Sequence, residues 1–247
     1  MMNIIRADFY RLRHGKALYV IFGILAVASA ILMIVQGVSG NTGNFELLNI
    51  LTSLVIIFCV PIFTCVAGPI FMDGTTKNEV SWGVSRIKLY LARVIVCTIL
   101  CVSLLAVYYG VGIAVATPFG GFGDGTENFW TNFLLTFAAQ SLMMVAACML
   151  GIFLVFSMKN VVAVVEVFAG IFALPAMIIQ FLPIMFDVNM ENIMRFLYFD
   201  LTTNMVRLGN IGGLETRSIL IILAVGAGWL IIPTVIGIIK FQRKEVG

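Results

Sequence analysis

Few side chains in this sequence have the type and spacing that catalysis needs. The single histidine, His14, lies in a basic run beside an apolar stretch, where an interfacial role is favoured over catalysis. A membrane enzyme would need paired acids, or a nucleophile with its base, at matching depth, and no such pair is found. The G-x-x-x-x-G-K-[ST] loop that cradles nucleotide phosphates is missing, as are H-E-x-x-H and G-x-S-x-G. The sequence therefore predicts no catalytic residue and no enzyme activity in this chain.

The five cysteines all lie inside apolar stretches and give no sign of an extracellular disulfide framework. Cys97 and Cys101 share a helix face at a spacing of four residues. No histidine lies near them, so ordinary packing is favoured over a metal site. No metal is expected.

Glu166 is the one acid well inside an apolar stretch, where a charge costs ~3 kcal/mol on insertion scales unless it is neutralised or paired. At 1.5 Å per residue it lies ~9 Å beyond Asn160. Arg93 lies about one turn inside another stretch from the same side, so the depths of the two side chains allow a salt bridge. Two interpretations stay open for Glu166, a structural ion pair with Arg93 and a role in the substrate path or in coupling.

The elements that position these residues are six apolar stretches. Each meets or exceeds the ~20 residues that a helix needs to cross the hydrocarbon core of a membrane. Hydrophobic residues make up 61% of the chain and charged residues only 11%, too few to coat a soluble fold. The stretches lack the apolar/polar alternation of a barrel. We therefore expect an all-α polytopic membrane protein, a single domain over 1–247 with six transmembrane helices. They run roughly over 17–38, 48–72, 89–116, 129–157, 161–185 and 218–240.

Lys and Arg residues gather in gaps that would all face one side of the membrane if the chain crosses it six times. The positive-inside rule makes that side cytoplasmic, so both termini are expected in the cytoplasm and the protein in the plasma membrane. Because these cations follow the inner leaflet, no nucleic-acid partner is expected despite the net charge of +3. Twelve of the 15 basic residues are in this set: Arg6, Arg11, Arg13, Lys16, Lys77, Arg86, Lys88, Arg93, Lys159, Lys240, Arg243 and Lys244.

Three segments outside the bilayer have patterns of their own. Ile5, Phe9 and Leu12 recur at helical spacing between basic residues, which predicts an N-terminal amphipathic helix over 1–16. Apolar residues at helical spacing predict a short helix in the cytoplasmic loop over 73–88. The external gap over 186–217 is expected to form one or two short helices or an irregular loop.

Prolines interrupt three of the predicted crossings. Pro61 and Pro69 lie in the second, Pro175 in the fifth and Pro233 in the sixth, and each removes a backbone hydrogen bond and favours a kink. Static bundles contain such kinks too, so a gating role and a structural one both stay open.

The layout resembles the permeases of type-2 ATP-binding cassette (ABC) transporters, especially the small subunits of bacitracin and lantibiotic immunity exporters. The match in length, topology and loop position covers nearly the whole chain. The residues that carry it are Asp8-Phe9-Tyr10-Arg11-Leu12-Arg13, then Lys77-Asn78-Glu79, Gly83-Val84-Ser85-Arg86, Tyr90 and Arg93.

In that family two permease subunits form the pore and a separate ATPase docks beneath each. The resemblance implies a second permease subunit, identical or homologous, and an ABC ATPase that binds ATP and Mg, with no cofactor in this chain. It implies export or clearance of an antimicrobial peptide such as a lantibiotic or bacitracin. It also implies a substrate route flanked by the second and fifth crossings, with Pro61, Pro69, Glu166 and Pro175. Coupling to the ATPase would fall to Lys77, Asn78, Glu79, Gly83, Ser85, Arg86 and Lys88.

Two other functions remain open. A self-contained secondary transporter or channel would need its own ion-coupling groups within the membrane, for which Glu166 alone is thin support. A non-transporting membrane immunity protein would sequester a peptide. Dependence of transport on an ATPase separates the permease from both.

Overall fold

The structure is a computed structural model in which every described segment of regular structure is helical. It describes residues 1–38, 48, 52, 55–68, 84–119, 129–158, 160–172, 198–209 and 211–243. The elements are α1 (Met2–His14), α2 (Lys16–Val38), η1 (Ile56–Phe58), α4 (Cys59–Ala67), α7 (Arg86–Ala116), η2 (Thr117–Phe119), α8 (Phe129–Ser157), α11 (Leu201–Leu208), η3 (Ile211–Gly213) and α12 (Thr216–Arg243). A further apolar helix covers Val161–Phe172.

Four of these helices, α2, α7, α8 and α12, are long and apolar enough to cross a membrane. The all-α membrane fold predicted from composition is therefore confirmed. Two shorter apolar helices, Ile56–Ala67 and Val161–Phe172, lie in the second and fifth predicted crossings, whose remaining residues are largely outside the described part of the chain.

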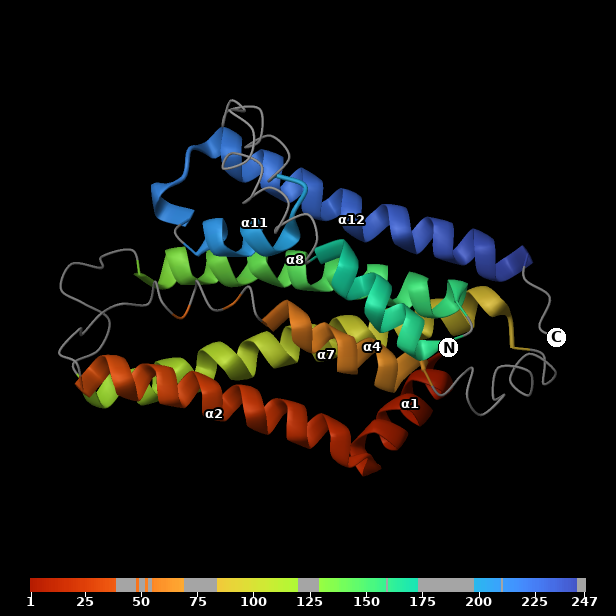
Figure 1. Ribbon diagram of the computed structural model, residues 1–247, viewed down its shortest axis with the longest axis horizontal. Coiled ribbons are helices and arrows are strands. Elements are labelled where there is room, and N and C mark those ends of the chain that lie inside the picture. Colours follow the sequence, from red (N-terminus) through yellow and green to blue (C-terminus); the bar gives the residue numbers. More distant parts are fainter. Residues whose placement is uncertain are drawn as a thin grey trace.

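The long helices lie side by side, with α1 and the C-terminal end of α12 at one end of the bundle, on the right in Figure 1. We call this the basal end. There Arg11 Nη2 donates to the carbonyl of Val66 at the end of α4, over 3.0 Å. Arg86 Nη1, at the start of α7, donates to the carbonyl of Gln242, also over 3.0 Å. At the opposite, distal end α11 lies over the first half of α8 (Figure 1).

The central helix is α8, which contacts α4, α7, α11 and α12. In the most apolar 18-residue segment of α8, 83% of the segment is buried, against 22% in α2 and 17% in α12. The helix α8 is therefore the core of the bundle. A helix that is apolar all round suits that place. Small residues let its neighbours come close, since the Phe63 ring of α4 lies directly against Gly151.

The outer helices α2 and α12 turn apolar side chains away from the bundle. Exposed residues include Val20, Ile24 and Val27 on α2 and Ile232 and Ile236 on α12. Contact of such faces with water would be unfavourable. They suit lipid or another membrane subunit, which would cover the apolar surface.

Two of the glycines of α12, Gly228 and Gly237, have opposite surroundings, which gives a matched test of this packing. A Cβ at Gly237 would collide with the phenol of Tyr90 on α7, whereas one at Gly228 would meet nothing within 4 Å. We expect Gly237→Ala to lower the stability of the detergent-solubilised protein by about 1–3 kcal/mol, because the ring must shift. Gly228→Ala should leave it unchanged or raise it slightly, since alanine favours the helix. Thermal unfolding measures both, and equal effects would contradict the packing.

Candidate functional site

The N-terminal helix α1 turns Asp8 into the protein. Asp8 and Leu12 are the buried residues of α1, and Arg6 and Arg13 are exposed. The helix ends at Gly15, where the backbone becomes extended before α2 begins. The face of α1 that packs on the bundle therefore carries an acid among apolar residues.

Asp8 forms an ion pair with Arg93 of α7 through Oδ1 and Nη1. Arg93 is 1% exposed and Asp8 4%, so both charges lie in the interior. The second cation near this carboxylate is Arg11, whose Nη2 lies 3.7 Å from Asp8 Oδ1. Breaking a buried pair by removing one partner is strongly destabilising, because the remaining charge stays desolvated. The pair thus holds α1 against the first turns of α7.

The same turns of α7 also contact α8 and α12. Tyr90, one turn before Arg93, packs on Phe156 of α8 with ring centroids 5.0 Å apart. Phe156 in turn packs edge-on against Phe241 of α12 at 4.7 Å. Together with the hydrogen bond from Arg86 to α12 and the ion pair with Asp8 of α1, these contacts join the start of α7 to three other helices. We refer to Asp8, Arg11, Arg86, Tyr90 and Arg93 as the basal cluster.

A second polar group lies buried toward the distal end. Tyr109 Oη of α7 donates to Gln140 Oε1 of α8 and lies 3.0 Å from Thr52 Oγ1 of the second apolar stretch. Gln140 Nε2 donates to the Met205 carbonyl of α11 over 2.8 Å. Thr52 and Gln140 have no exposed surface. This chain of hydrogen bonds, the distal network, connects four segments that are far apart in sequence.

The short helix α11 is held by its own capping residues as well as by the network. Asp200 accepts hydrogen bonds from the backbone N–H of Thr202 at 3.0 Å and from the hydroxyl of Thr203 at 2.7 Å. Such an N-cap satisfies donors that a helix start leaves open. Gln140 lies 11 residues after Phe129, about 16 Å along α8, so α11 reaches down beside the apolar part of α8.

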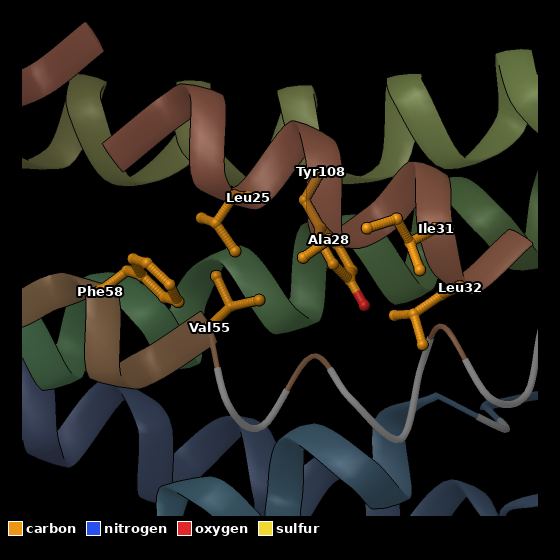
Figure 2. Close-up of a pocket in the computed structure, with 7 residues that line it drawn as sticks. All are labelled: Leu25, Ala28, Ile31, Leu32, Val55, Phe58 and Tyr108. Atoms are coloured by element: carbon orange, nitrogen blue, oxygen red, sulfur yellow. The ribbon is translucent and has the colours of Figure 1, made fainter. Parts of the chain in front are cut away.

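An apolar recess of about 360 Å³ lies between α2 and the second apolar stretch (Figure 2). Among the lining residues, only Tyr108 has a polar side-chain group. Its hydroxyl donates a hydrogen bond to the Leu48 carbonyl at 2.9 Å. The recess can therefore hold apolar groups and offers no site for a charged ligand. Its lining residues are Leu25, Ala28, Ile31, Leu32, Val55, Phe58 and Tyr108.

In the described part of the chain, no group of three or more His, Cys, Asp or Glu side chains is arranged to hold a metal ion. Cys59, Cys97, Cys101 and Cys148 are buried in the core. The Cys59 thiol lies 3.6 Å from the Met144 carbonyl, to which it donates. These thiols serve as small packing groups.

A family model described as a protein of unknown function, DUF2705, matches residues 16–247. The chain belongs to the DUF2705 family. Among curated proteins, none matches the chain.

In this DUF2705 chain, three of the residues expected to couple to an ATPase are described, and they lie at the basal end. Ser85 caps α7, its side chain accepting from the Lys88 N–H at 3.4 Å. Arg86 contacts the end of α12. The other expected coupling residues, Lys77, Asn78, Glu79 and Gly83, fall outside the described residues.

Of the residues expected along a substrate path, Pro61 and Glu166 are described, whereas Pro69 and Pro175 are not. Pro61 lies in the first turn of α4, directly after the 3-10 turn η1. There the missing N–H costs little, because the first turn of a helix leaves its donors open. Pro61 thus lies close to the point where the 3-10 turn η1 changes into the α-helix α4.

The ion pair expected between Arg93 and Glu166 is replaced by the one between Arg93 and Asp8. Glu166 lies on the exposed side of the helix Val161–Phe172. The depth of the two residues was compatible with a bridge, but depth does not fix the direction in which a side chain points around its helix. Arg93 faces α1, and its guanidinium is enclosed there.

Sequence reasoning missed Asp8 and Gln140 as central residues. The apolar pattern of Ile5, Phe9 and Leu12 leaves Asp8 off the apolar face of the predicted N-terminal helix, although Ile4, Asp8 and Leu12 share one face at four-residue spacing. Gln140 is a polar residue inside an apolar run, which was itself a signal of a buried hydrogen bond. Both are polar groups within apolar patterns.

The buried ion pair predicts a large effect of Asp8→Asn. The change leaves the Arg93 charge without its counterion, and we expect a loss of about 3–5 kcal/mol in the free energy of unfolding. Thermal unfolding in detergent measures it. Arg13→Gln, an exposed change on the same helix, should stay within about 0.5 kcal/mol. The double variant Asp8→Leu/Arg93→Met should recover most of the loss, and a double variant as unstable as Asp8→Asn would argue against the pair.

The distal network predicts that Gln140→Leu loosens α11. The Met205 carbonyl loses its donor, so we expect about 1–3 kcal/mol of local destabilisation and faster amide hydrogen exchange across Leu201–Leu208. Ser141→Ala is the matched control, because the Ser141 hydroxyl bonds within α8, to the Phe137 carbonyl. Unchanged exchange in Gln140→Leu would mean that apolar packing alone holds α11.

Proposed function

We propose that this chain is the membrane-spanning permease subunit of an ATP-driven ABC exporter, crossing the plasma membrane six times with both termini in the cytoplasm. ATP hydrolysis is assigned to a partner ATPase, in keeping with the missing phosphate-binding loop of this sequence. The substrate class, an antimicrobial peptide such as a lantibiotic or bacitracin, rests on the family resemblance.

The connectivity between the two ends of the bundle supports six crossings. The second apolar stretch leads from the distal end of α2 to the end of α4, which contacts α1 at the basal end. The chain that follows α8 leaves from the basal end, and α11 lies at the distal end (Figure 1). Under the proposal, each of these two returns accounts for one crossing beyond the four complete helices.

The distribution of cations supports cytoplasmic termini. Exposed basic side chains at the basal end include Arg6, Arg13 and Lys16, with Lys240 and Arg243 at the end of α12. At the distal end Arg217 lies in the first turn of α12, two residues after Glu215. The basal end is thus the positive end, which the inner leaflet attracts.

The observation that carries the proposal is the basal cluster. Lys77 to Lys88 would form the ATPase dock, and this stretch leads directly into the turns of α7 that bear Tyr90 and Arg93. Those turns are tied to α1 by the buried ion pair, to α8 by Tyr90 and to α12 by Arg86. A displacement of the dock by an ATPase would therefore act on four helices at once, because packed helices transmit movement as rigid bodies.

Two further features agree with the permease proposal. The docked helix α11 lies between the fifth and sixth predicted crossings, where the resembled family has external helices. The apolar recess is lined partly by the second crossing, which the resemblance places beside the substrate route. A secondary transporter would need buried ion-coupling groups. The polar groups of the distal network are instead hydrogen-bonded to one another between helices.

Affinity purification of the tagged chain from native membranes in mild detergent tests the proposal. We expect an ABC ATPase to co-purify, and Lys77→Glu to reduce its amount about tenfold, since charge reversal at a dock weakens association. Arg217→Glu, the same change at the distal end, should leave it unaltered.

Transport measured in cells lacking that ATPase is the complementary experiment. Transport is expected to stop. Persistent transport, or the absence of any ATPase from the purified assembly, would falsify the permease proposal.

A further inference from the structure

The helix Val161–Phe172 has one side packed and one side open. Val164 and Phe168 are buried, and the Phe168 ring lies 5.0 Å from that of Phe63 on α4. Val162, Glu166 and Val167 point away from the bundle, with Val162 63% exposed. A charged residue thus sits on the outward side of a helix that is otherwise apolar.

The depth of Glu166 makes this exposure unusual. It lies about 9 Å beyond Asn160, which precedes the helix at the basal end, so its carboxylate faces the apolar layer. No cation of the described residues lies within ion-pair distance of it, and the two ion pairs of that part of the chain both belong to Asp8. A carboxylate in hydrocarbon needs a counter-charge or water.

Small residues surround Glu166 on the helix. Ala163, Ala169 and Gly170 lie three or four residues from it and therefore flank it on the helix surface. Small side chains at this spacing let a second helix approach closely, as is common where membrane helices pack. The face combines room for a neighbouring helix with a charge that requires a partner.

We propose that this face, Val162, Ala163, Glu166, Ala169 and Gly170, is the contact surface for a second membrane subunit that presents a Lys or Arg side chain to Glu166. The inference rests on the proposed function, in which the chain works beside another permease subunit, and it names the surface and the chemistry of that contact. The partner helix carries its cation about 9 Å inside the basal edge of the membrane.

Charge favours a different subunit over a second copy of this chain. A two-fold contact centred on this face would set two Glu166 carboxylates opposite each other, and like charges repel. The described cation at comparable depth, Arg93, is enclosed in its pair with Asp8 and is not presented outward. A subunit with its own basic residue satisfies Glu166 without such repulsion.

Site-specific photo-crosslinking in native membranes tests the surface. A photoreactive residue replaces Val162 on the proposed face or, as the control, Ile236 on the exposed face of α12. We expect the Val162 site to give an adduct with a membrane subunit whose crosslinked segment, mapped by mass spectrometry, contains Lys or Arg. The Ile236 site should not give this adduct.

Charge reversal then tests the chemistry. Glu166→Arg should reduce the Val162 adduct about tenfold, and reversing the mapped basic residue of the partner to Glu should restore it. Glu215→Gln, which removes an exposed acid at the start of α12, should have no effect. The inference is overturned by an adduct with lipid only, with a second copy or with this chain itself, and by an adduct that Glu166→Arg leaves unchanged.

The same samples separate this inference from the proposed function. If the ATPase co-purifies while the Val162 site reacts only with lipid, the inference fails and the permease proposal stands. If the adduct forms and responds to charge reversal without any ATPase in the assembly, the contact is real but belongs to another kind of membrane complex.

Discussion

The buried ion pair between Asp8 and Arg93 is the constraint on which the basal half of the structure depends. Neither charge could remain in this interior alone, so the position of α1 and the start of α7 are fixed together. Arg11 adds a third point by reaching the end of α4. A segment that otherwise would lie freely on the membrane surface is thereby made part of the bundle.

Within the described part of the chain, the basal cluster and the distal network have different roles. The basal cluster joins α1, α4, α7, α8 and α12 around one buried pair of charges, next to the loop proposed to meet an ATPase. The distal network is uncharged and joins α7, α8 and α11 through hydrogen bonds. In an apolar environment such bonds define which helices are neighbours, because the hydrophobic effect does not distinguish one apolar helix face from another there. Between the two groups, α8 supplies close packing through small residues.

Much of the fold could be predicted from the sequence. Length and hydropathy correctly predicted α2, α7, α8 and α12, since a span needs only a sufficient run of apolar residues. The candidate site was predicted less well. The sequence singles out Glu166 as the acid that needs a partner and Arg93 as a cation at matching depth, whereas the structure pairs Arg93 with Asp8. The spacing of Ile5, Phe9 and Leu12 leaves Asp8 off the apolar face of this helix. The face that Asp8 shares with Ile4 and Leu12 is turned inward because α7 places Arg93 against it.

The sequence by itself determined the class of protein, the positions of its long helices and the end at which its cations gather. These properties follow from composition and from distance along the chain. The tertiary structure alone decided which side of each helix faces the core, which acid neutralises Arg93, and that α11 docks on Gln140. The physical reason is that a rise of 1.5 Å per residue fixes depth, whereas the rotation of a helix about its axis is set by its neighbours. Glu166 illustrates both points. Its distance along the chain fixes its depth, whereas its side of the helix is exposed in the described part of the chain.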